Sequence, residues 1–372
     1  MKALFLSSDA SIPDIASATR LRMQGYADEI GELHVLIRSG RTRTTSDGSI
    51  IIHEVRTNKW LAPLSLPGHA RALIRKHGIE IVSAQDPFEH GLVGVSAVKG
   101  TSAKLHVQVH TDFLSPWFTH GYTRLVLMNH VRSWIASYVL PRAHGIRAVA
   151  PRVKRSMIAR YGTRIKEPSV IPVLIVDDNE EYAEVASPFP ITLLVLGRLE
   201  PEKRFQDAIY ALRELRKLHP DAGLVIAGEG SESKRLRHET EALGLSGWVR
   251  FLGMRSDVSQ LMRASHVMLQ TSAYEGYSRT LVEAARARLA IATTDVGIVG
   301  DVLIPNVHVL ANHVADVVAL TENVERLIAD DAFRRSLTDS AYETISKHLA
   351  TYENQAAMIA HDLRDTLLVE RA

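Results

Sequence analysis

The segment TSAYEGYSRTLVEAARARLAIATTDVG, residues 271–297, carries two glutamates, Glu275 and Glu283, eight positions apart. Its pattern predicts a strand, a loop at Gly276 and a helix that begins near Thr280. The first backbone N–H groups of a helix have no partner within the helix and carry partial positive charge, so this helix start could bind a phosphate. Ionised carboxylates only accept hydrogen bonds, so the two glutamates would suit the vicinal hydroxyls of a ribose and of a sugar.

The same residues also have a purely structural explanation. The run from Thr280 to Glu283 fits a capping box, in which Thr280 is the N-cap and Glu283 reaches back to it. A second segment, ITLLVLGRLEPEKRFQDAI, favours the binding site over the capping box. It predicts a strand followed by Arg198, which could bind a diphosphate with two parallel hydrogen bonds, and by Lys203, which could add a point charge.

Short apolar runs alternate with helical patterns along the whole chain, and helix 203–218 is one example. Most of the runs are continuously apolar, as expected for strands that are buried on both faces. This alternation predicts an α/β fold of two Rossmann-like, doubly wound parallel-sheet domains facing a cleft, with ligands at the carboxyl ends of the strands. The predicted strands are 2–8, 32–39, 50–55, 79–85, 104–110, 145–151, 169–175, 191–197, 223–230, 248–253, 266–270, 290–294 and 308–311.

A chain of 372 residues that is 46% hydrophobic can form two sizeable cores. The segment 166–191 contains four prolines and a cluster of acidic residues, which is typical of a break between domains. We therefore predict an N-terminal domain (1–175), a linker (176–190), a C-terminal domain (191–348) and a last helix (349–372) that packs back on the first domain.

The composition excludes several classes of protein. The sequence has no cysteine, which rules out disulfides and thiolate chemistry and fits a reducing compartment. The N-terminal run MKALFLSSDASIPD is too short for a signal peptide, and no stretch reaches 18 consecutive apolar residues. The expected location is therefore cytoplasmic, without a membrane span.

Five segments of the second half resemble a known family in both order and spacing. They are GRLEPEK (197–203), VIAGEG (225–230), VRFLGMRSDVSQLMRASHVML (249–269), SAYEGYSRTLVEA (272–284) and TTDVG (293–297). Over about 110 residues this half resembles the retaining glycosyltransferases of glycosyltransferase family 4, which have the GT-B fold. The resemblance implies transfer of a sugar from a nucleoside diphosphate sugar, a UDP- or GDP-sugar, to an acceptor hydroxyl with retention at the anomeric carbon. It also implies that the reaction needs no metal and no further cofactor.

The resemblance also implies roles for individual residues. Arg198 and Lys203 would hold the diphosphate, Glu275 the hydroxyls of the donor sugar, and Glu283 the ribose. A histidine at a comparable strand end, here His110, would meet an outer hydroxyl of that sugar, which makes Glu275 and His110 the expected catalytic pair. The other expected donor-site residues are Gly228, Gly253, Met254, Gly276, Tyr277, Ser278, Arg279, Thr280 and Leu281.

Four positions depart from the family pattern. Arg288 and Ala290 replace a usual glycine and proline, Arg204 replaces a glycine after Lys203, and Ile298 replaces a second glycine after TDVG. We expect these changes to alter the packing of the residues that support the donor site. They should affect donor specificity more than activity.

The first half follows the family only in outline. Arg20 follows the loop that would face the acceptor, and it is either a contact of phosphate or acceptor or a surface charge. The segment KLHVQVHTDFLSP contains His106, His110 and Asp112, of which Asp112 is an acceptor-side candidate; a histidine at a strand end is more often structural than catalytic. Gln85 and Asp86 follow a strand and could line the acceptor side, but a capped helix start at Asp86 is the favoured interpretation.

The charge is distributed unevenly along the chain. Residues 1–176 contain 23 Lys and Arg and 12 Asp and Glu, a formal charge of +11, whereas the remainder carries −9. Segment 113–166 has ten basic and no acidic residues, and its helix 125–143 is amphipathic. This pattern favours an anionic membrane surface as partner, on the inner face of the cytoplasmic membrane, and a saccharide or lipid-linked acceptor in cell-surface polysaccharide or glycolipid synthesis. No nucleic-acid-binding module is recognisable.

Two alternatives remain open from the sequence. One is a nucleotide-sugar epimerase with the same fold, which would convert the donor without any acceptor. The other is a binding partner that holds nucleotide sugars without catalysis.

Overall fold

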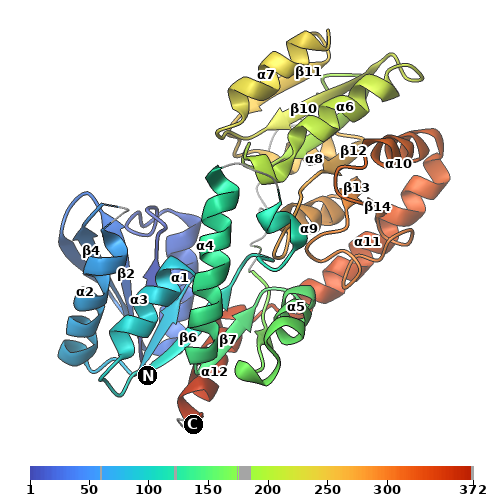
Figure 1. Cartoon of the computed structure of the whole chain (residues 1–372). Coiled ribbons are helices and arrows are strands. Elements are labelled where there is room, and N and C mark those ends of the chain that lie inside the picture. Colours follow the sequence, from blue (N-terminus) through green and yellow to red (C-terminus); the bar gives the residue numbers. More distant parts are fainter. Residues whose placement is uncertain (59–60, 121–123, 174, 176–185, 370–372) are drawn as a thin grey trace. The chain divides into compact units, whose positions relative to one another are not determined.

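The computed structural model describes residues 1–58, 61–120, 124–173, 175 and 186–369 (Figure 1). The chain forms two compact units. Unit 1 comprises Met1–Pro172 together with Tyr352–Ala372, and unit 2 comprises Val173–Thr351.

Unit 1 is built on an eight-stranded sheet of order β3-β4-β2-β1-β5-β6-β7-β8. Every pairing in it is parallel except that of β3 with β4, which is antiparallel. The strands are β1 (Lys2–Ser7), β2 (Glu32–Ser39), β3 (Arg43–Asp47), β4 (Ile50–Arg56), β5 (Ile81–Ala84), β6 (Lys104–Val109), β7 (Gly145–Ala148) and β8 (Ser169–Val170).

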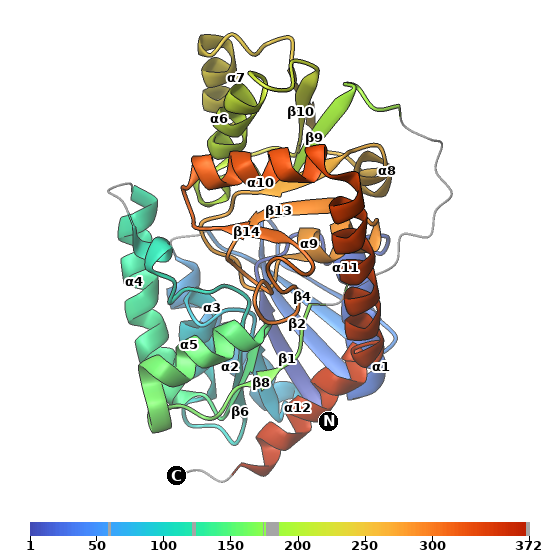
Figure 2. The same ribbon diagram turned by 90° about the vertical axis from the view of Figure 1, so that its right-hand side faces the viewer.

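Helices cover both faces of this sheet, as expected for parallel strands buried on both sides (Figure 2). Helices α1 and α12 lie side by side on one face, and α2, α3 and α4 pack in succession on the other. The helices of unit 1 are α1 (Ala18–Ile30), α2 (Ala62–His77), α3 (Glu89–Val98), α4 (Arg124–Val139), α5 (Pro151–Tyr161) and α12 (Gln355–Leu368).

Unit 2 has a six-stranded, entirely parallel sheet of order β11-β10-β9-β12-β13-β14. Its strands are β9 (Ile191–Leu196), β10 (Ala222–Ala227), β11 (Val249–Gly253), β12 (Val267–Gln270), β13 (Ala290–Thr294) and β14 (Leu310–Asn312). Its helices are α6 (Phe205–Leu215), α7 (Ser233–Ala242), α8 (Val258–Arg263), α9 (Arg279–Arg286), α10 (Val317–Ala329) and α11 (Asp331–Thr351).

Polar contacts as well as apolar ones attach α12 to unit 1. The Tyr26 hydroxyl of α1 donates to Gln355 Oε1 at 3.0 Å, and His106 Nε2 lies 2.9 Å from Asp362 Oδ2. Apolar residues of α12, such as Ile359 and Leu363, complete the core of unit 1. His106 is fully buried on β6, so its contact with Asp362 helps to attach α12 to the sheet.

The predicted α/β class with two doubly wound parallel sheets is confirmed, and each of the thirteen predicted strands overlaps an observed one. One part of the predicted linker is wrong, because Phe189 is buried and its ring lies so close to Gly223 that an added Cβ there would be 2.3 Å from it. Residues 186–190 therefore belong to unit 2, while 176–185 lie outside the described residues.

Candidate functional site

The carboxyl ends of β9, β10 and β11 in unit 2 are held together through their backbones. Gly228 N–H donates to the Gly253 carbonyl at 2.7 Å, and Gly197 N–H donates to the Ala227 carbonyl at 3.0 Å. A Cβ at Gly228 would lie 1.8 Å from the Gly197 oxygen, and the φ of Gly228 is +139°, so this approach requires glycine. Gly228 and Gly253, expected at the donor site, thus shape the edge from which Arg198 projects.

Lys203 and Glu275 are brought together at the same edge. Lys203 Nζ lies 2.5 Å from Glu275 Oε1, which also accepts from Ser272 Oγ at 2.7 Å. The loops that carry the pair are joined by two more hydrogen bonds, from Thr271 Oγ1 to the Lys203 carbonyl and from Ala273 N–H to the Glu202 carbonyl, both 2.7 Å. The two side chains are partly buried, so a cation and a carboxylate share one small region of the surface.

The start of α9 has no side-chain cap. Its N-cap is Ser278, whose φ is +73° and whose hydroxyl donates to Gln270 Oε1 at 2.5 Å. Thr280 lies inside the helix and donates to the same oxygen at 2.9 Å, and Glu283 pairs with Arg279 at 3.2 Å. The capping-box interpretation is therefore wrong: neither Thr280 nor Glu283 satisfies the first backbone N–H groups of the helix, which remain suited to an anion.

Gln270, the last residue of β12, is a site residue that the sequence did not indicate. Its side chain is buried and its oxygen accepts from the two hydroxyls of the α9 start. Among the described residues its Nε2 has no hydrogen-bond partner. A buried amide donor without a partner is costly, so this group is suited to donate to a bound ligand.

The remaining predicted donor residues fall into two groups. Tyr277 and Leu281 are buried, and Tyr277 Oη lies 2.9 Å from His348 Nε2. Both residues therefore anchor the loop before α9, and α9 itself, in the interior of unit 2. Gly276 is buried in the same loop. The side chains of Arg198 and Met254, by contrast, lie on the surface; Arg198 is 72% exposed and pairs with Glu202 at 3.5 Å.

Two of the departures from the family pattern occupy left-handed backbone conformations. Arg204 has a φ of +49° and forms two hydrogen bonds with Asp207, at 2.8 and 3.0 Å. Arg288 has a φ of +53°, pairs with Asp339 and stacks on the Tyr342 ring at 4.0 Å. Because glycine adopts a left-handed φ without strain, this conformation explains why glycine is usual at both positions. Each arginine is strained there but forms side-chain contacts that a glycine would lack.

In unit 1, His110 directly follows the carboxyl end of β6. Its Nε2 lies 3.2 Å from Gln108 Oε1. Burial, together with the positive charges of Arg147 and Arg22, lowers the pKa of His110 to about 3, so the ring is neutral near pH 7. A neutral imidazole can donate or accept one hydrogen bond with a hydroxyl, which suits the predicted role.

Of the other residues considered in unit 1, Asp112 and Arg20 are buried and Asp86 is partly exposed. Burial raises the pKa of Asp112, and its Oδ1 has no hydrogen-bond partner among the described residues. Arg20 is 5% exposed and donates to Asp47 at 2.8 Å, so its interpretation as a surface charge is wrong. The N-cap of α3 is Phe88, but the Asp86 carboxylate accepts from Phe88 N–H at 2.8 Å and from His90 N–H at 3.1 Å, so Asp86 binds the start of this helix through its side chain.

A cavity of about 330 Å³ opens beside the carboxyl ends of β2 and β4 in unit 1. It contains a buried carboxylate, Glu54, which accepts from Ser39 Oγ at 2.9 Å and from Arg41 Nε at 3.1 Å. Burial alone would raise the pKa of Glu54, but these hydrogen bonds outweigh burial and lower it. The lining residues are Ala10, Pro13, Ile37, Arg38, Ser39, Gly40, Glu54 and Thr57.

Helix α4 exposes four apolar side chains at helical spacing. Leu127, Val131, Trp134 and Tyr138 are 67%, 52%, 71% and 41% exposed, and we refer to them together as the α4 surface. For one of the ten basic residues of segment 113–166 the prediction of a surface charge is wrong. Arg147 is buried and donates to Gln108 and to the carbonyls of Ile171 and Pro172. Exposed basic residues of segment 113–166 are Arg142, Arg155, Arg160, Arg164 and Lys166.

Comparison with known proteins identifies the class. A family model described as Glycosyltransferase Family 4 matches residues 23–179, and one described as Glycosyl transferases group 1 matches residues 178–344. The chain therefore belongs to the glycosyltransferases of the family 4 type, with the GT-B fold.

Individual relatives match parts of the chain. It is 32% identical over 145 residues to a glycogen synthase of Mycobacterium tuberculosis, covering 38% of this chain and 35% of the relative. It is 32% identical over 140 residues to one component of the human phosphatidylinositol N-acetylglucosaminyltransferase, covering 37% and 28%. The matches to these curated relatives thus span about a third of the relatives' length.

Solved structures share the fold over nearly the whole chain. Sucrose-phosphate synthase from Thermosynechococcus elongatus has a TM-score of 0.80 at 16% identity, with 100% of both chains covered. HepE of Anabaena, solved with UDP and glucose, has a TM-score of 0.71 at 20% identity, covering 98% of this chain and 100% of HepE. Within the described residues, no helix is both long and apolar enough to cross a membrane.

Proposed function

We propose that the chain transfers a sugar from a nucleoside diphosphate sugar to an acceptor hydroxyl, with retention of the anomeric configuration. The observation that carries this proposal is the meeting of Lys203, Glu275 and the uncapped start of α9 at the carboxyl edge of the sheet of unit 2. Positive charge from Lys203 and from the helix start would stabilise a diphosphate, and Glu275 would accept from sugar hydroxyls. HepE, which has the same fold, was solved with UDP and glucose, and this supports a nucleotide sugar as donor.

In this mechanism the diphosphate is both anchor and leaving group. Lys203, the α9 amides and the exposed Arg198 would neutralise the charge that develops on it as the glycosidic bond breaks. We propose that these groups replace a metal ion at the diphosphate. Retention without a covalent nucleophile would place the acceptor on the same face as the departing phosphate, which would take up the proton of the acceptor hydroxyl.

We further propose that the cavity of unit 1 receives a hydroxyl-rich acceptor, a saccharide or a lipid-linked saccharide. Its lining combines a carboxylate, a guanidinium and hydroxyls with the apolar side chains of Ile37 and Pro13, and this mixture suits a sugar ring. Through the α4 surface and the exposed basic residues of segment 113–166, unit 1 would associate peripherally with an anionic membrane.

Binding measurements on two variants test the donor site. We expect Lys203→Ala to weaken the binding of UDP or GDP alone, because it removes charge from the diphosphate. We expect Glu275→Gln to weaken the binding of UDP-glucose or GDP-mannose roughly 10- to 150-fold while UDP and GDP bind at least as tightly as before, because a hydrogen bond to a charged group contributes about 1.5–3 kcal/mol. Isothermal titration calorimetry measures both effects, and Glu214→Gln on the exposed face of α6 is the matched control.

Product analysis separates the remaining alternatives. With the preferred donor, an acceptor-dependent release of nucleoside diphosphate supports transfer, whereas epimerised donor formed without acceptor would contradict it. Proton NMR of the product reports the anomeric configuration, and inversion would contradict the proposed stereochemistry. If Glu275→Gln bound sugar nucleotides as tightly as the unaltered chain, its role as the sugar ligand would be excluded.

A further inference from the structure

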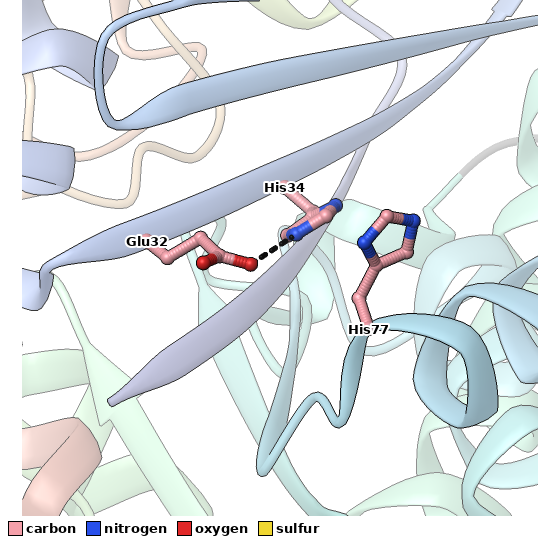
Figure 3. Close-up of side chains that lie close together, drawn as sticks. All are labelled: Glu32, His34 and His77. Carbon is pink, nitrogen blue, oxygen red and sulfur yellow. Dashed lines mark hydrogen bonds and ion pairs between the residues drawn. The ribbon is translucent and has the colours of Figure 1, made fainter.

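Three metal-ligand side chains of unit 1 point toward one another beside β2 (Figure 3). Glu32 and His34 come from β2, and His77 is the last residue of α2. His34 Nε2 lies 2.9 Å from Glu32 Oε1, and the potential ligand atoms of all three residues lie within 4.8 Å of one another. His34 is fully buried, whereas Glu32 and His77 are partly exposed, so the cluster can be reached from solvent.

The position of the cluster follows from the fold. Residues two apart on a strand point to the same face, which places Glu32 beside His34. Both stand at the start of β2, and α2 ends over them at His77, followed by the left-handed Gly78. The starts of parallel strands lie at the opposite edge of the sheet from their ends, where His110 and the cavity of unit 1 are found. The cluster is therefore separate from the proposed acceptor side.

A second layer of hydrogen bonds orients His34. Its Nδ1 lies 2.8 Å from Nε2 of His53 on β4, and the planes of the two rings are nearly parallel, with an interplanar angle of 4°. His53 Nδ1 in turn lies 3.2 Å from Thr44 Oγ1. With His34 Nδ1–H donating to His53, the lone pair on His34 Nε2 faces Glu32 and His77, and metal-binding histidines are commonly oriented in this way.

Only one of the two carboxylate oxygens of Glu32 faces His34. Lys2 contacts Glu32 through the other carboxylate oxygen, Oε2, at 3.0 Å, and leaves Oε1 directed at His34.

We propose that Glu32 Oε1, His34 Nε2 and a ring nitrogen of His77 bind a Zn²⁺ ion, with water as the fourth ligand. Two imidazoles and a carboxylate form a donor set that zinc accepts. In a tetrahedral site with bonds of about 2.1 Å the ligand atoms are about 3.4 Å apart, so Glu32 and His34 need to separate by roughly half an ångström. Glu32 is partly exposed and can make this movement. The ion would fasten the end of α2 to the start of β2 and stabilise unit 1.

Zinc titration of the untagged, metal-stripped chain tests the proposal. We expect one Zn²⁺ per chain by calorimetry, a rise in melting temperature that saturates at that ratio, and visible absorption bands of tetrahedral geometry when Co²⁺ replaces zinc. His34 is buried and its replacement endangers folding, so the variants are Glu32→Gln and His77→Gln, each expected to weaken binding at least tenfold. His69→Gln, exposed on the same helix and outside the cluster, is the matched control and should bind as the unaltered chain does.

Two results would overturn the zinc site. One is the absence of stoichiometric binding by the unaltered chain. The other is unchanged zinc affinity in His77→Gln, which would mean that the histidines form only a structural hydrogen-bonded cluster.

Discussion

At the scale of single residues, Arg204 and Arg288 show how a side chain can compensate for an unfavourable backbone. Both have left-handed φ values, which cost a non-glycine residue about 1–2 kcal/mol. Arg204 holds the buried Asp207, whose pKa burial raises, through two hydrogen bonds. Arg288 pairs with the exposed Asp339 and stacks on the half-buried ring of Tyr342. We therefore expect Arg204→Gly to lower the free energy of unfolding by roughly 1–3 kcal/mol, because it leaves a buried acid without its partner.

The same change at Arg288 is the comparison. Exposed ion pairs contribute little, so Arg288→Gly should leave the free energy of unfolding within about 1 kcal/mol of its original value. Urea unfolding measures both variants. If Arg204→Gly proved more stable than the unaltered chain, backbone strain would outweigh the Asp207 contact and the explanation would be wrong.

At the scale of elements, the turns after β9 and β10 approach so closely that a single added methyl group at Gly228 should destabilise unit 2. Gly228→Ala places a Cβ 1.8 Å from the Gly197 oxygen, and at a φ of +139° the backbone cannot easily relax. We expect a loss of roughly 2–5 kcal/mol in the free energy of unfolding and weaker binding of UDP and GDP, because Arg198 follows the displaced turn. Gly247→Ala, in open space at an ordinary φ, should be neutral or stabilise by up to about 1 kcal/mol. Equal stability of the two variants would contradict the role of this contact.

Most elements could be predicted from the sequence because buried parallel strands are dense in Val, Ile and Leu. Strand β3, RTTSD, could not, because it is polar and largely exposed at the edge of the sheet and lacks the apolar run of a buried strand. Lys203 and Glu275 were indicated by family motifs on two separate loops, and the structure brings them together. Gln270 could not be found, because its role depends on hydroxyls eight and ten residues further on, and Arg147 looked like a surface charge because sequence does not show burial.

At the scale of the whole molecule, the two halves of the chain differ in charge, and the exposed α4 surface belongs to the positively charged half. Residues 1–176 carry a formal charge of +11, and residues 177–372 carry −9. Helix α5 lies beside α4, where Ser137 Oγ is 3.2 Å from Tyr161 Oη, and Arg142 stacks on Tyr138 at 3.8 Å. Aromatic and aliphatic side chains at a bilayer surface, with basic residues around them, combine partial insertion with attraction to anionic lipids.

Vesicle co-sedimentation therefore tests whether unit 1 associates with membranes. We expect the chain to sediment with vesicles that contain phosphatidylglycerol, to bind neutral phosphatidylcholine vesicles much more weakly, and to be released by high salt, since each basic residue near the surface contributes about 1 kcal/mol. The double variant Val131→Glu with Trp134→Glu should lose at least tenfold in affinity, because it places two negative charges on the α4 surface. Leu218→Glu, an equally exposed leucine in unit 2, is the control and should bind as before. Equal binding to neutral and anionic vesicles, or full binding by the double variant, would mean that this surface serves another purpose.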